Sequence, residues 1–135
     1  MIKNGVYAAG LSILNSDKSL NIKSTIDHAE SAIKSGLHGV FFFGSTGQSQ
    51  LLSISEKKEL ISKTSTSKFK NQFYFGTGVN SLKDNLDLIR YSMEFGYQTF
   101  LIMPPAYYKG NTDKGIYNFY AEIIAQVPKI KIIIY

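Results

Sequence analysis

The chain has 135 residues, of which 44% are hydrophobic and 19% charged, and this composition is typical of a single globular domain rather than a disordered segment. Its net charge of +5 comes mainly from lysines spread along the chain without an arginine-rich or aromatic motif, so we expect no nucleic-acid partner. The absence of cysteine excludes disulfides and thiolate metal sites, and two histidines without paired carboxylates predict no metal site.

The first apolar stretch follows Lys3 and extends from Gly5 to Leu14. It lacks the small-residue cleavage site of a secretory signal, so we expect a strand over Val6–Leu11 and then a loop. No apolar run approaches the roughly 20 residues needed to cross a bilayer. We therefore expect a cytoplasmic protein without membrane contact.

Helical spacing then alternates with short apolar runs. A stripe that begins at Ile22 and repeats at i+4, i+7 and i+11 predicts the first helix, which Gly36 ends. Ser53 and Glu56 predict a capping box for a second helix that runs to about Thr64. The five expected strands are Val6–Leu11, Val40–Phe43, Phe73–Phe75, Phe100–Met103 and Ile130–Tyr135.

Two further helices are expected in the second half of the chain. Ser81 starts the third, which ends near Gly96, and the fourth begins near Asn111 or Thr112 and ends before Pro128. Their buried faces are expected at Leu82, Leu86, Ile89 and Met93, and at Ile116, Phe119, Tyr120, Ile123 and Val127.

Strands that are apolar on both faces and separated by helices predict a parallel sheet with right-handed crossovers. Two α/β folds fit this order: a five-stranded doubly wound sheet, or half of a TIM (β/α)₈ barrel. The last strand has no helix after it, whereas a doubly wound domain normally continues into one. We therefore expect residues 1–135 to form the N-terminal (βα)₄β portion of one barrel domain, truncated after strand 5.

Functional groups of parallel α/β folds gather beyond the carboxyl ends of the strands. The turn Gly44–Ser49 follows the second strand and offers the hydroxyls of Ser45 and Thr46 beside a flexible glycine backbone, which suits a carboxylate or phosphate. The other residues expected at this edge are Gly76–Asn80, Pro104–Tyr108 and Tyr135.

This edge carries hydroxyls but no acidic pair and no cysteine, which disfavours glycosidase, carboxylate-metal and thiol mechanisms. Ser45 and Thr46 also occur commonly as plain turn residues. The segment Gly76–Gly78 lacks the third glycine of a dinucleotide-binding fingerprint, so we expect no such cofactor.

Several segments together resemble the pyruvate-dependent class I aldolases grouped around dihydrodipicolinate synthase and N-acetylneuraminate lyase. The matches occur in order and span the chain. They are Gly5–Tyr7 in the opening strand, Gly44–Gly47 with the G-[ST]-T-G-E signature, Leu52, Ser53 and Glu56 with L-[ST]-x-x-E, Gly76–Gly78 and Asn80 with the G-T-G segment, Pro105–Tyr108 with P-x-Y-Y, and Ile132–Tyr135 with the strand before the catalytic tyrosine.

The resemblance implies a TIM barrel in which a lysine on the sixth strand forms a Schiff base with pyruvate, without a cofactor. By similarity, Ser45 and Thr46 hold the pyruvate carboxylate. Tyr135 transfers protons to and from the imine intermediates and is coupled through the Ser45 hydroxyl to Tyr108. The Schiff-base lysine is absent from this chain, so we expect residues 1–135 alone to be inactive.

The resemblance also implies partners. In the family, the tyrosine that matches Tyr108 reaches into a neighbouring subunit's site, so we expect a homo-oligomer, a dimer or tetramer. The expected substrates are pyruvate and an aldehyde, and the activity expected first is 4-hydroxy-tetrahydrodipicolinate synthase, which condenses pyruvate with aspartate semialdehyde in lysine biosynthesis. Gln48 replaces the family's acidic residue, which keeps N-acetylneuraminate lyase or a 2-keto-3-deoxy sugar-acid aldolase open as alternatives.

A flavodoxin-like FMN-binding module is the alternative from another class. The hydroxyl-rich turn Ser45–Ser49 resembles a flavin-phosphate loop, and Tyr107 or Tyr108 could stack on the flavin ring. Against it, the turn follows the second strand instead of the first.

Overall fold

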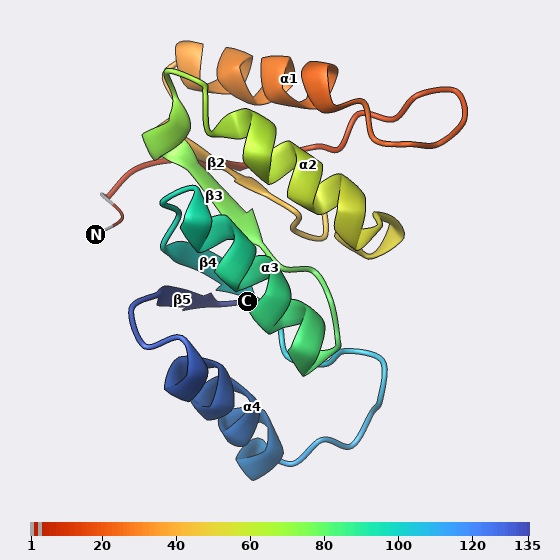
Figure 1. Cartoon of the computed structure of the whole chain (residues 1–135), viewed down its shortest axis with the longest axis vertical. Coiled ribbons are helices and arrows are strands. Elements are labelled where there is room, and N and C mark those ends of the chain that lie inside the picture. Colours follow the sequence, from red (N-terminus) through yellow and green to blue (C-terminus); the bar gives the residue numbers. More distant parts are fainter. Residues whose placement is uncertain (1, 3) are drawn as a thin grey trace.

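Strands and α-helices alternate along the chain in the computed structural model, which describes residue 2 and residues 4–135 (Figure 1). The described residues also form two short 3-10 helices, η1 (Ser49–Leu51) and η2 (Lys70–Gln72). The main elements are β1 (Tyr7–Ala9), α1 (Ile22–Lys34), β2 (Gly39–Phe42), α2 (Ile54–Thr64), β3 (Phe73–Gly76), α3 (Leu82–Glu94), β4 (Thr99–Ile102), α4 (Asp113–Gln126) and β5 (Lys131–Ile134).

The sheet has the strand order β1-β2-β3-β4-β5, and every neighbouring pair is parallel. A doubly wound sheet reverses its strand order at a switch point, which this sheet does not. The doubly wound alternative is therefore wrong. The flavodoxin-like module is wrong for the same reason, because its fold is a doubly wound sheet. The expected (βα)₄β order of a TIM barrel is confirmed.

The helices cover one face of this sheet and follow it from α1 to α4 (Figure 1). Strand residues that face the helices are buried, including Phe42, Phe75 and Phe100, while Phe41 and Tyr74 on the other face are only half-buried. Because all strands run the same way, the loops after β2, β3 and β4 meet at one edge. That edge carries the candidate site.

Side-chain caps explain where the helices begin. Asn21 accepts a hydrogen bond from the backbone N–H of Ser24 and starts α1, and Ser81 and Thr112 cap α3 and α4 as expected. The predicted capping box of α2 is present, with reciprocal bonds between Ser53 and Glu56. Local hydrogen bonding therefore defines the helix starts.

Strand bounds differ slightly from those expected. β1 is shorter than the predicted Val6–Leu11, because its pairing with β2 covers only Tyr7–Ala9, and Val6 and Leu11 are exposed. Tyr135 lies just after β5 instead of within it, although its backbone N–H still donates to the carbonyl of Ile102 at 3.1 Å. This position lets the Tyr135 side chain leave the sheet at the site edge.

The predicted helix faces are largely buried. Leu86, Ile89, Tyr120, Ile123 and Val127 lie in the core. The other predicted residues are half-buried and pack against the core: Leu82, Met93, Ile116 and Phe119. The core also contains Leu88, which was not predicted. No helix among residues 2 and 4–135 has the length and apolar character to cross a membrane.

Candidate functional site

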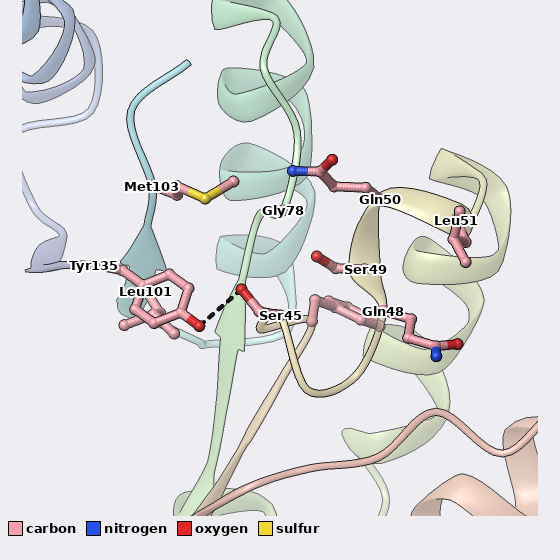
Figure 2. Close-up of a pocket in the computed structure, with 10 residues that line it drawn as sticks. Ser45, Gln48, Ser49, Gln50, Leu51, Gly78, Leu101, Met103 and Tyr135 are labelled. Atoms are coloured by element: carbon pink, nitrogen blue, oxygen red, sulfur yellow. Dashed lines mark hydrogen bonds between the residues drawn. The ribbon is translucent and has the colours of Figure 1, made fainter. Parts of the chain in front are cut away.

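A cavity of about 390 Å³ lies at the site edge, beyond the carboxyl ends of β2, β3 and β4 (Figure 2). Its wall combines the hydroxyl-rich turn after β2 with side chains from β4 and the end of β5. The lining residues are Phe43, Ser45, Gln48, Ser49, Gln50, Leu51, Gly78, Leu101, Met103 and Tyr135.

One hydrogen bond joins two segments that are 90 residues apart in sequence. The Tyr135 hydroxyl donates to Oγ of Ser45 at 2.8 Å, at the side of the cavity (Figure 2). Tyr135 is 52% exposed, so the pair is open to a ligand. Two hydroxyls in series can pass a proton between a ligand and solvent, so this pair has the geometry of a candidate proton-transfer site.

Hydrogen bonds hold the turn that carries Ser45 in a strained backbone conformation. The backbone N–H of Gln48 donates to the carbonyl of Ser45 at 2.9 Å, and the Ser12 hydroxyl donates to the carbonyl of Gly47 at 2.6 Å. Phe43 and Gln48 have positive φ angles of 62° and 50°, which non-glycine residues rarely adopt. Such backbone strain persists only where the surrounding structure holds it, and it is frequent at ligand sites.

The turn after β3 packs directly on the same loop. Gly78 has a φ of +58°, and a Cβ atom on it would lie 2.2 Å from Oγ of the buried Ser49. A Cβ atom on Gly76 would lie 2.7 Å from the carbonyl oxygen of Phe43. Both glycines are therefore needed for close contact between the two loops.

Two of the four predicted site residues line the cavity and two do not. Ser45 and Tyr135 meet at the cavity, whereas Thr46 is exposed and lies outside the residues that line it. Tyr108 is 75% exposed and makes an edge-on contact with Tyr107, with ring centroids 5.2 Å apart. The roles expected for Thr46 and Tyr108 stay predictions.

A buried lysine behind the cavity was not predicted. Lys57 of α2 is 0% exposed, and its ammonium donates to the carbonyls of Thr77 at 3.0 Å and Gly78 at 3.3 Å. Burial lowers the pKa of Lys57 to about 8, against the opposing effect of the Asp84 carboxylate. The sequence carried a signal, because Lys57 starts the inward stripe of α2, which continues at Leu60, Ile61 and Thr64.

The described part of the cavity wall contains neither a lysine nor a carboxylate. Across residues 2 and 4–135, no three His, Asp or Glu side chains lie close enough together to hold a metal ion. The groups that the cavity offers to a ligand are therefore hydroxyls, the amides of Gln48 and Gln50, and backbone.

Comparison with protein families identifies the family of this chain. Residues 3–135 match the model of the Dihydrodipicolinate synthetase family. The chain belongs to this family. It matches a 4-hydroxy-tetrahydrodipicolinate synthase of Legionella pneumophila with 37% identity over 119 residues, which cover 87% of this chain and 40% of the synthase. Another relative, an L-threo-3-deoxy-hexylosonate aldolase of Aspergillus niger, is 29% identical over 142 residues, which cover 99% of this chain and 42% of the aldolase.

Solved structures of the Dihydrodipicolinate synthetase family share the fold. The chain superposes with a TM-score of 0.86 on YagE, a prophage protein of that family from E. coli K12 whose crystal structure is a complex with pyruvate. The sequence identity is 21%, and the match covers all of this chain and 45% of YagE. The chain thus spans less than half the length of the relatives that it matches, and its fold is the N-terminal part of their barrel.

Proposed function

We propose that this chain supplies the pyruvate-binding edge of a Schiff-base lyase, and that the reaction is that of 4-hydroxy-tetrahydrodipicolinate synthase. The hydrogen bond between Tyr135 and Ser45 carries the proposal, because it joins the proton-transfer group to the carboxylate-binding turn at one cavity. The similarity to the Legionella synthase, 37% identical over 119 residues, supports the family and is the reason for proposing this activity first.

In this proposal the pyruvate carboxylate lies against the Gly44–Ser49 turn. The hydroxyls of Ser45 and Thr46 and nearby backbone N–H groups donate to its oxygens. The Tyr135 phenol then faces the keto carbon and moves protons to and from it, with Ser45 as the relay. Tyr108 is proposed to act from a second subunit, since its ring is exposed in this one.

A keto-deoxy sugar-acid aldolase is the second candidate. The amides of Gln48 and Gln50 line the cavity, and an amide both donates to and accepts from sugar hydroxyls. The similarity to the Aspergillus aldolase also supports this second candidate. N-acetylneuraminate lyase belongs to the same group of alternatives. The homo-oligomer and the cytoplasmic location stay predictions.

Pyruvate binding tests the proposed role of the turn. The 135-residue chain is expected to bind pyruvate, and Ser45→Ala is expected to weaken binding about tenfold, because a hydrogen bond to a charged group is lost. Titration with pyruvate, followed by NMR chemical shifts or calorimetry, measures this. Ser31→Ala, at an exposed position of α1, is the control and should bind like the wild type. Equal affinity of Ser45→Ala and the wild type would contradict the proposal.

Borohydride trapping tests whether this chain forms an imine by itself. No residue in the described cavity wall carries a primary amine, so pyruvate and borohydride are expected to leave the mass of the chain unchanged. Intact-mass spectrometry makes the comparison, with the full-length Legionella synthase as the positive control. A stoichiometric pyruvate adduct on one lysine of this chain would overturn the expectation.

A further inference from the structure

Lys57 is a buried cation without an ion-pair partner. It is fully buried on α2, and the ion pairs of the described residues join other lysines to carboxylates. Asp84 of α3 acts on it through space, while the groups that contact it from the β2 and β3 loops, Phe43, Thr77 and Gly78, are uncharged. Burying a charge without an ion-pair partner costs free energy of folding, so we expect the Lys57 ammonium to have a function that offsets this cost.

The Lys57 ammonium lies beside both loops that form the cavity wall. It lies 5.9 Å from the centre of the Phe43 ring, at the start of the Gly44–Ser49 turn. It also donates to the carbonyl of Gly78, the residue that packs against Ser49. Phe43, Ser49 and Gly78 all line the cavity, so a single layer of residues separates this charge from a ligand.

We propose that Lys57 is a positioning residue for carboxylate binding: its buried ammonium supplies, through the cavity wall, the positive potential that draws a carboxylate to the Gly44–Ser49 turn. The inference rests on the proposed function and adds the source of charge that the neutral cavity wall lacks. Water is largely excluded from the ammonium, so its field is screened less than that of a surface lysine. A carboxylate in the cavity adds a second negative charge to that of Asp84 near Lys57.

Charge and shape are separated by comparing two ligands. Pyruvate carries a carboxylate, and pyruvamide replaces it with a neutral amide of similar size. Lys57→Met is expected to weaken pyruvate binding about tenfold and to leave pyruvamide binding within about twofold. Lys57→Arg retains the charge and should restore pyruvate affinity to within about threefold of the wild type.

Lys58→Met is the matched control. Lys58 is the next residue of α2 and is paired with Asp87 at 2.7 Å. Its replacement by Met changes the net charge by the same amount as Lys57→Met. Pyruvate affinity of this variant should equal that of the wild type. For the wild type, pyruvate affinity should fall as the pH rises through about 8, where the Lys57 charge is lost, and the affinity of Lys57→Met should show no such step.

The outcomes separate this inference from the proposed function. Equal losses for pyruvate and pyruvamide in Lys57→Met would show a purely structural role and overturn the inference alone. Wild-type binding of acetate as tight as pyruvate, weakened by Lys57→Met, would retain the inference and overturn the pyruvate-specific function. Wild-type binding of neither anion would overturn both. If Lys57→Met does not fold, a flat wild-type affinity between pH 7 and about 9.5 overturns the inference.

Discussion

Gly78→Ala is expected to lower the free energy of unfolding by about 3 kcal/mol and to abolish measurable pyruvate binding. The left-handed backbone at φ +58° costs an alanine about 1 kcal/mol, and forcing a methyl group into a packed site typically costs about 1–3 kcal/mol more. The added Cβ would meet Oγ of Ser49 at 2.2 Å and the carbonyl oxygen of Phe43 at 3.0 Å. Both neighbours belong to the cavity wall, so relief of the overlap must deform it.

Urea unfolding and pyruvate titration together test this expectation, with Gly36→Ala as the control. Gly36 also has a positive φ, +103°, but nothing lies within 4 Å of the position of its Cβ. Its replacement should cost backbone strain alone and leave pyruvate binding unchanged. If Gly78→Ala proves no more destabilising than Gly36→Ala, the close packing of the two loops is contradicted.

The stability of the chain is expected to rise by about 2 kcal/mol between pH 7.5 and 9.5 through Lys57. Burial lowers the folded-state pKa from 10.5 to about 8, so the folded chain releases this proton first. Between those two pKa values the unfolded chain binds more protons, and the free energy of unfolding therefore increases with pH. Below about pH 8 both states are protonated and the contribution is flat.

Lys57→Met isolates this effect from other groups that titrate at alkaline pH. The pKa values of Tyr74, Tyr97 and Tyr120 are raised, in each case chiefly by burial, and this lowers stability at still higher pH in both proteins. Urea unfolding at the two pH values should show the increase in the wild type and not in the variant. Parallel pH profiles of the two proteins would mean that Lys57 titrates normally.

In the proposed function, Gln48 and Gln50 are the amides of this chain that face the second substrate. Both amides lie on the wall formed by this chain, and they suit the hydroxyls of a sugar acid as well as the polar groups of an amino-acid aldehyde. In the same proposal, the hydrogen-bonded pair of Ser45 and Tyr135 acts on pyruvate.

Local patterns in the sequence determined the secondary structure and the family. The capping box at Ser53 and Glu56, the stripe of α1 and the apolar strands each act within a few residues, so they can be recognised without the fold. Six short motifs in order along the chain, among them the turn with Ser45 and Thr46, predicted the family for the same reason, because each keeps particular residues at fixed spacing.

Tertiary structure decided what depends on distant segments. The sequential strand order excluded the doubly wound sheet, since strand pairing is set by crossovers and long-range packing. It brought Tyr135 to Ser45 across 90 residues and left Tyr108 exposed. The fold also buries Lys57 behind the cavity. A lysine can point inward there because carbonyls of another loop accept hydrogen bonds from its ammonium.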